Sequence, residues 1–236
     1  MKKFAVFDID GTLIRWQLYH AVVDKLLNNG VVSSKNSSQL REARMNWKKR
    51  KSENEFKTYE KLLIKIFEDS LPEISVQDFD KSVNEVFQQY SDQVYTYTRD
   101  LIDELKNRDY FLIAISGSHE ELVQKIAARF GFDEYIGTKY QRKSNKFTGD
   151  KTIGSHDKQA KLREIINKHQ LTYKESFAIG DSLSDSGMLE IVENPIAFNP
   201  NKELLKTARS AGWKIVIERK NVVYELNRKG DNYVLA

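Results

Sequence analysis

The sequence predicts an α/β protein with a doubly wound, Rossmann-like parallel sheet as its core and an inserted α-helical cap domain. Two observations support this fold class. Short apolar runs of strand length recur along the chain and are continuous, which is typical of strands buried on both faces of a parallel sheet. Helical patterns lie between most of these runs, and such alternation indicates right-handed crossovers between parallel strands.

Five apolar runs are the expected core strands. In chain order they are FAVFD (4–8), FLIAIS (111–116), FAIGD (177–181), PIAF (195–198) and KIVIE (214–218). The helical patterns around them are DLIDELKNR, ELVQKIAARFG, KQAKLREIINKH and KELLKTARSAG, the last ending at Gly212 as helices often do. Between the second and third runs, residues 134–154 include Gly149 and Gly154 and predict a strand or hairpin.

The first gap between strands is unusually long. Its apolar residues recur at three- and four-residue intervals, as amphipathic helices require. A gap of this length inside a compact domain is not expected to be a structureless loop. We therefore predict a helical cap over residues 15–95 and a discontinuous α/β core over residues 1–14 and 96–236. The residues after 218 indicate no function.

The composition excludes several classes of protein. The chain of 236 residues is 40% hydrophobic and 31% charged, an ordinary balance for a soluble protein. It has no cysteine, so disulfides and thiolate catalysis are excluded, and its four histidines are not spaced as zinc ligands. No apolar run could span a bilayer and no secretory hydrophobic region follows the N-terminus, so we expect a cytoplasmic protein with no membrane partner.

The charge balance is mildly basic, with a formal net charge of +4 and a pI near 8.9. Six basic residues gather in REARMNWKKRK (41–51), which is usually a solvated helix face. The alternative is a patch that attracts anionic substrates or nucleic acid. No nucleic-acid motif is present, so we expect no such partner, and we expect a monomer or a homodimer.

Polar or acidic residues stand at the carboxyl ends of three predicted strands, of which the first and third carry aspartates. The first ends at Asp8 and Asp10, and the third ends at Asp181, with Asp185 shortly after. Because ligands bind beyond the carboxyl ends of parallel strands, these groups are expected to converge. Clustered carboxylates are unfavourable unless a cation neutralises them, and ligation by oxygen alone suits Mg²⁺.

The second strand ends at Ser116 and Gly117, where a hydroxyl and backbone N–H groups would hold phosphate oxygens. Together with a lysine and a divalent ion, these groups are the parts of a phosphoryl-transfer site. Each has a plainer explanation when taken alone. A lone aspartate is commonly a turn or helix cap, and Ser116 and Ser118 could simply begin the next helix. The joint occurrence favours catalysis.

Four segments in order, AVFDIDGT, LIAISGS, a helix-leading lysine and GDSLSD, resemble the motifs of the haloacid dehalogenase (HAD) superfamily of phosphatases. The closest likeness is to the branch with a helical cap inserted after the first strand, which includes phosphoserine phosphatases. The resemblance covers almost the whole chain and is weakest inside the insertion. Dehalogenases of the superfamily lack the second aspartate, so Asp10 favours a phosphatase.

The resemblance implies roles for individual residues. Asp8 would be the nucleophile that forms an aspartyl-phosphate, and Asp10 the general acid and base. Mg²⁺ would be held by the carboxylates of Asp8 and Asp181 and the backbone carbonyl of Asp10. Asp185 would contact the ion or its ligands. Ser116 would hydrogen-bond a phosphoryl oxygen.

The motif lysine has three candidates, Lys151, Lys158 and Lys161, and the frame FTGDKTIGSHDKQAKL favours Lys158. Lys158 would then bind the phosphoryl group together with Ser116 and Gly117. True phosphoserine phosphatases generally carry an acidic residue where this chain has Gln17, nine residues after Asp8. A neutral amide is no charge partner for an ammonium group, which argues against phosphoserine. Gln17, with Arg15 and Trp16, would instead bind a different leaving group of the substrate. Trp16 would either stack on a substrate ring or pack the hinge of the cap.

Together these features predict an Mg²⁺-dependent phosphatase that hydrolyses a small phosphorylated metabolite and is not strictly specific for phosphoserine. The alternative is a receiver-like signalling module. Such a module also accepts phosphate on an aspartate of a doubly wound sheet, but it holds the phosphoryl group without turnover.

Overall fold

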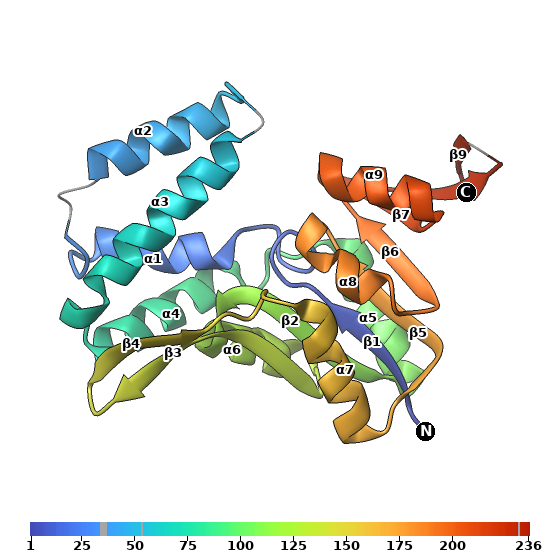
Figure 1. The fold of residues 1–236 in the computed structure, drawn as a ribbon, viewed down its shortest axis with the longest axis horizontal. Coiled ribbons are helices and arrows are strands. Elements are labelled where there is room, and N and C mark those ends of the chain that lie inside the picture. The colour runs from blue at the N-terminus through green and yellow to red at the C-terminus, as the bar shows by residue number, and fades with distance from the viewer. Residues whose placement is uncertain (34–36, 53, 231) are drawn as a thin grey trace.

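The computed structural model describes residues 1–33, 37–52, 54–230 and 232–236, and in this part of the chain one nine-stranded sheet is flanked by helices (Figure 1). The strands, in sheet order, are β4 (Lys146–Thr152), β3 (Glu134–Lys143), β2 (Phe111–His119), β1 (Lys3–Phe7), β5 (Thr172–Gly180), β6 (Asn194–Phe198), β7 (Lys214–Arg219), β8 (Val222–Lys229) and β9 (Asn232–Leu235).

The six strands from β3 to β7 in this order pair in parallel, and β4, β8 and β9 add antiparallel partners at the edges. This arrangement confirms the predicted α/β class. Phe7, the last residue of β1, is paired with Ala114 on one side and Ile179 on the other. The register therefore brings the carboxyl ends of β1, β2 and β5 to one edge of the sheet.

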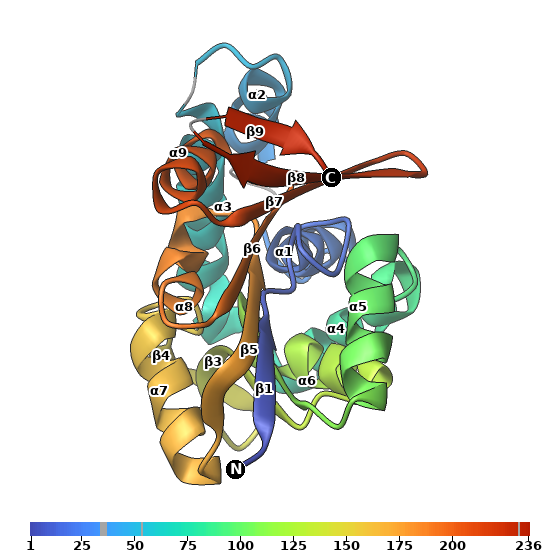
Figure 2. The same ribbon diagram turned by 90° about the vertical axis from the view of Figure 1, so that its right-hand side faces the viewer.

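Helices cover both faces of the sheet, as Figure 2 shows with the sheet seen edge-on. The helices of the core are α5 (Thr96–Asn107), α6 (Glu120–Phe130), α7 (Lys158–His169), α8 (Ser186–Leu189) and α9 (Lys202–Ala211). Alternate residues of β1 point to opposite faces. Ala5 and Phe7 join the hydrophobic cluster of α5 and α6, and Phe4 and Val6 join that of α7 and α9.

The long insertion is helical, as its pattern predicts. It contains α1 (Leu18–Asn28), α2 (Ser37–Lys48), α3 (Glu55–Ser70) and α4 (Val76–Tyr90). Buried residues of these helices share one hydrophobic cluster with the core. The division into a core and a separate cap domain stays a prediction.

The β3–β4 hairpin, predicted between residues 134 and 154, holds the inserted helices (Figure 1). Arg142 of β3 donates hydrogen bonds of 3.0 and 2.7 Å to Asp80 of α4, and Phe79 packs edge-on against Phe147 of β4. The backbone N–H of Val76 donates to the carbonyl of Asn145 in the hairpin turn. The hairpin therefore fixes α4 relative to the sheet.

Two elements differ from the sequence expectation. Strand β2 continues to His119 instead of ending at Ser116, so Ser116 and Ser118 both lie within the strand and neither caps α6. The residues after 218, which carried no expectation of structure, form β8 and β9 and extend the sheet. No helix of the described residues is long and apolar enough to cross a bilayer.

Glu218 at the end of β7 caps α5 across the chain. Its Oε1 accepts from the backbone N–H of Thr96 at 3.0 Å, its Oε2 accepts from that of Tyr97 at 2.9 Å, and the residue is 7% exposed. The first N–H groups of a helix have no partner within the helix, and a carboxylate there is also favoured by the helix dipole. Glu218 thus anchors the point where the chain returns from the insertion.

We predict that Glu218→Ala lowers the free energy of unfolding by about 2 kcal/mol, because two helix N–H groups lose a buried carboxylate partner. Urea titration measures this change. The control is Glu225→Ala on β8, whose half-exposed carboxylate pairs with Lys214. The control should cost less than about 1 kcal/mol, and equal effects in both variants would contradict the capping role.

Candidate active site

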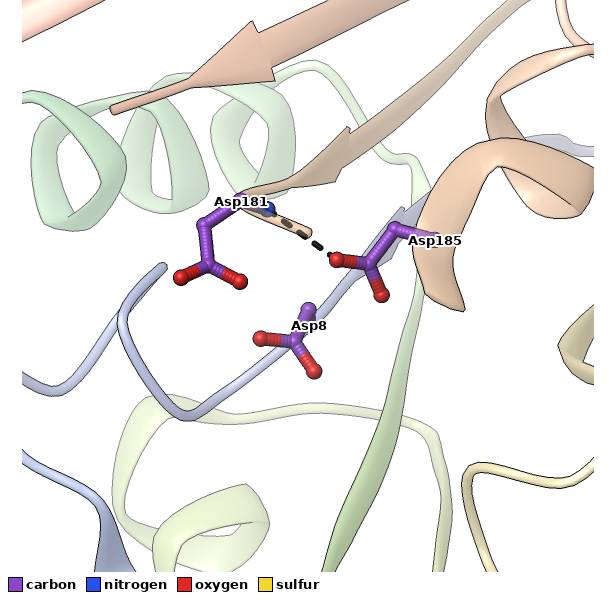
Figure 3. Close-up of side chains that lie close together, drawn as sticks. All are labelled: Asp8, Asp181 and Asp185. Atoms are coloured by element: carbon purple, nitrogen blue, oxygen red, sulfur yellow. Dashed lines mark hydrogen bonds between the residues drawn. The ribbon is translucent and has the colours of Figure 1, made fainter. Parts of the chain in front are cut away.

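Three aspartates meet at the carboxyl edge of the sheet. Asp8 follows β1, Asp181 follows β5, and Asp185 ends the 3₁₀ turn before α8. Their carboxylates point toward a common space, as Figure 3 shows, and one oxygen from each lies within 4.8 Å of the others. Asp185 also shapes the loop, because its Oδ2 accepts from the backbone N–H of Asp181 at 3.1 Å and of Ser182 at 2.9 Å.

Lys158 is the cation of this cluster. Its Nζ donates to Oδ1 of Asp8 at 2.7 Å and to Oδ1 of Asp185 at 2.6 Å, and its side chain is 2% exposed. Lys158 is the first residue of α7, which is capped by Asp157 in a left-handed conformation with a φ of 48°. Of the other two candidate lysines, Lys151 pairs with Glu68 and Lys161 donates to the carbonyl of Gly154.

The electrostatics show an excess of negative charge. Burial, and to a smaller extent the charges of Asp185 and Asp10, raise the pKa of Asp8 to about 7 against the lowering effect of Lys158. Burial, Asp8 and Asp185 raise the pKa of Asp181. Burial alone would lower the pKa of Lys158, but Asp185 and Asp8 raise it above its ordinary value. One lysine therefore offsets the charge of several carboxylates only in part. The oxygen ligands that Asp8, Asp181 and Asp185 offer fit a hard divalent cation such as Mg²⁺.

Asp10 faces a different set of partners. Its Oδ2 accepts from the hydroxyl of Ser116 at 2.6 Å, and its Oδ1 accepts from the hydroxyl of Ser118 at 2.9 Å and from the backbone N–H of Leu18 at 2.5 Å. Burial raises the pKa of Asp10, although these hydrogen bonds oppose the shift. Asp10 is thus held by β2 and by the start of α1, beside the acidic cluster.

A cavity of about 730 Å³ opens over these groups. Asp8, Asp10, Asp181 and Lys158 line it, as do Gly117 and Gln17. Ser116 and Asp185 are completely buried behind the cavity wall. Ser116 therefore contacts Asp10 in this structure, and its predicted contact with a phosphoryl oxygen stays a prediction.

The hydrogen bond from Ser118 to Asp10 was not predicted from the sequence, which offered Ser118 only as a possible start of the next helix. Ser118 follows Ser116 by two residues, and residues two apart on a strand point to the same side. The signal was the spacing in SGS, and it becomes informative only because β2 extends beyond Ser116.

Arg15, Trp16 and Gln17 also line a neighbouring cavity of about 350 Å³. Trp16 is 47% exposed and stacks on Tyr90 of α4, with ring centroids 5.8 Å apart. Arg44, from the basic stretch, is bonded to Asp24 and Tyr59 and lines this second cavity. Trp16 therefore packs against the inserted helix α4, which agrees with the expectation that it packs between the insertion and the rest of the chain.

A family model described as haloacid dehalogenase-like hydrolase matches residues 5–190. A histidinol-phosphatase of Neisseria meningitidis is 25% identical over 231 residues, which cover 92% of this chain and 99% of that protein. A phosphoserine phosphatase of Methanocaldococcus jannaschii is 30% identical over 100 residues, which cover 41% of this chain and 47% of that protein.

Solved structures share the fold. A Bordetella pertussis protein of unknown function superposes with a TM-score of 0.73 at 18% identity, covering 92% of this chain and 99% of that one. A substrate-bound phosphoserine phosphatase superposes with a TM-score of 0.65 at 20% identity, covering 94% and 95%. The chain belongs to the haloacid dehalogenase-like hydrolase family, and it is a phosphatase within that family. The predicted family resemblance is confirmed.

The backbone of Gly11 is tied to this site. Gly11 has a φ of +81°, and a Cβ there would lie 2.3 Å from Oδ2 of Asp181. Gly30 has a similar φ of +71°, but a Cβ there would meet nothing within 4 Å. The two glycines share the left-handed backbone and differ in the close approach to Asp181.

We predict that Gly11→Ala abolishes phosphatase activity, because the new methyl group must displace Asp181. Gly30→Ala should keep full activity and lose only about 1 kcal/mol of stability to the left-handed conformation. Hydrolysis of p-nitrophenyl phosphate and urea titration measure the two effects. An active Gly11→Ala enzyme would show that the close approach to Asp181 is unimportant.

Proposed function

We propose that this protein is an Mg²⁺-dependent phosphatase that hydrolyses a small phosphomonoester through an aspartyl-phosphate on Asp8. The observation that carries the proposal is the placement of Asp8 within the acidic cluster, bonded to Lys158 and open to a cavity that Asp10 also lines. Asp8, Asp181 and Asp185 are the carboxylates able to hold the ion. When bound, Mg²⁺ would offset negative charge on Asp8 and on the phosphoryl group.

Lys158 would orient Asp8 for its nucleophilic attack on phosphorus. The lysine binds Oδ1 of Asp8, and within the described residues Oδ2 has no hydrogen-bond partner. Oδ2 would attack phosphorus, forming the acyl phosphate as the bond from phosphorus to the leaving oxygen breaks. Lys158 would also stabilise charge on the phosphoryl oxygens.

Asp10 is suited to move the proton. Its raised pKa favours a protonated carboxyl that can donate to the leaving alkoxide. The same group, once ionised, would accept a proton from the water that hydrolyses the acyl phosphate. Ser116 and Ser118 would orient this carboxyl through their hydrogen bonds to it.

The substrate is proposed to be a small phosphorylated metabolite that is not restricted to phosphoserine. Gln17 lines the cavity with a neutral amide. The relatives include a histidinol-phosphatase and phosphoserine phosphatases, so L-histidinol phosphate and phosphoserine belong in any panel of phosphorylated metabolites used to test the enzyme.

We predict that Asp8→Asn abolishes hydrolysis of p-nitrophenyl phosphate in the presence of Mg²⁺ while leaving the circular dichroism spectrum unchanged. Asp10→Asn should slow turnover by about 10²- to 10⁴-fold, because it removes only the proton transfer. The wild-type enzyme should release phosphate continuously. A single stoichiometric labelling of Asp8 without turnover would instead support the receiver-like alternative, and an active Asp8→Asn variant would refute the nucleophile assignment.

We predict that Asp181→Asn raises the melting temperature of the metal-free protein at pH 8. Because the pKa of Asp181 is raised in the folded protein, the ionised carboxylate destabilises the fold increasingly as the pH rises above the ordinary value of 3.8. Removing its charge should add about 2–4 °C for each kcal/mol relieved. Mg²⁺ should raise the melting temperature of the wild type and have little effect on the variant.

The control for this experiment is Glu190→Gln, an exposed carboxylate just after α8. It should leave both the metal-free stability and the response to Mg²⁺ unchanged. As the pH falls toward 3.8, the difference between Asp181→Asn and the wild type should vanish, because Asp181 is then protonated in the folded protein. If Mg²⁺ did not change the melting temperature of the wild type, the proposed metal site would be contradicted.

A further inference from the structure

We infer that the preferred substrates are phosphomonoesters of amino alcohols, and that Glu60 of α3 selects them by pairing with the ammonium group. The inference rests on the proposed function and adds the chemical class of the leaving group. Such a group carries a positive charge and no carboxylate.

The face of α3 that meets the cavity follows a helical repeat. Phe56, Glu60, Ile64 and Glu68 all line the 730 Å³ cavity, and each follows the previous one by four residues. Residues four apart lie on the same side of a helix. Glu60 therefore faces the cavity because of its place on α3, and its side chain remains 39% exposed.

Glu60 lies on the side of the cavity where the leaving group must go. Asp10, the proposed acid, accepts from the backbone N–H of Leu18 at the start of α1. His20 follows on the same helix, also lines the cavity, and its Nε2 lies 3.8 Å from Oε1 of Glu60. Helix α1 therefore contacts Asp10 at its start and Glu60 through His20, and all three side chains line the same cavity.

The cations of the cavity are already paired. Lys158 is bonded to Asp8 and Asp185, as described above. Lys57 lies 3.2 Å from Glu203, and Lys151 is bonded to Glu68, which also accepts from the hydroxyl of Tyr140 at 3.0 Å. No arginine lines this cavity among the residues that the structure describes.

This pairing decides which substrate charge the cavity favours. A substrate carboxylate would have to compete with Glu203 or Glu68 for a lysine. A substrate ammonium would find Glu60, whose nearest ion-pair partner in the described part of the chain is His20 at 3.8 Å, beyond hydrogen-bond distance. The cavity therefore favours an amino alcohol over an amino acid as the leaving group.

The remaining lining suits a short carbon skeleton. Tyr19, Phe56, Ile64 and Tyr140 present rings and one aliphatic side chain to the cavity. These side chains can bury methylene groups or a ring between the phosphate and the ammonium group. Glu60 on α3 thereby supplies the carboxylate that the position of Gln17 lacks.

The test compares two substrates that differ in one group. O-phosphoethanolamine carries an ammonium where 2-hydroxyethyl phosphate carries a hydroxyl, and O-phospho-L-serine adds a carboxylate to the former. For the wild type, kcat/KM should be about tenfold or more higher for O-phosphoethanolamine than for either of the others, as expected for a charge-assisted contact. L-Histidinol phosphate, a larger amino-alcohol ester, should also be preferred over O-phospho-L-serine.

Glu60→Gln should reduce the preference for O-phosphoethanolamine over 2-hydroxyethyl phosphate to within about threefold, while kcat/KM for the hydroxyl compound stays unchanged. The matched control is Glu55→Gln on the same helix, which lies outside the cavity and is bonded to Ser52. It should keep the wild-type preference. Circular dichroism and melting temperatures establish that both variants fold.

Two outcomes would overturn the inference. An unchanged preference in Glu60→Gln would show that Glu60 does not meet the ammonium group. An equal loss for both substrates would assign Glu60 to the support of His20 instead. Hydrolysis of p-nitrophenyl phosphate separates this inference from the proposed function. If that ester is hydrolysed and no amine preference exists, only the inference fails, whereas no hydrolysis of any ester refutes the proposed function.

Discussion

The mutual repulsion of buried carboxylates is the constraint on which the site depends. Asp8, Asp181 and Asp185 lie close enough to share one ion, and burial raises the pKa of Asp8 and of Asp181. Lys158 offsets part of this cost by bridging Asp8 and Asp185. One lysine cannot neutralise the whole cluster, so the protein keeps an excess of negative charge that a bound divalent cation would offset.

The backbone around the cluster is shaped to keep these charges in place. Gly11 adopts a left-handed conformation and lets Asp181 approach. Asp157, also left-handed, begins α7 so that Lys158 is its first residue. The N–H groups of Asp181 and Ser182 both point at Asp185. Glycine adopts the left-handed conformation at little cost, whereas the left-handed Asp157 is unfavourable by itself and stands where it places Lys158 against the carboxylates.

Local pattern was enough to predict the five core strands and the residues that follow them, but not β8 and β9. The apolar run before Asp8 and the frame around Lys158 are features of neighbouring residues, and they are visible without coordinates. The cap of α5 by Glu218 and the contact of Ser118 with Asp10 join residues more than 100 positions apart. No local pattern encodes such pairs, because they depend on how the sheet is ordered and where β2 ends.

The prediction of substrate specificity from Gln17 was limited in the same way, because it used neighbouring positions in the sequence alone. The distance of Gln17 from Asp8 along the chain suggested a cavity without a partner for an ammonium group, but distance along the chain is not distance in space. Helix α3 brings Glu60 into the cavity from more than 40 residues further along. The groups proposed for catalysis lie on the edge of the sheet, and the groups proposed for selectivity lie on an inserted helix. Substitutions on the cavity-lining face of α3 are therefore expected to change the preferred leaving group without disturbing the carboxylates and the lysine that would transfer the phosphoryl group.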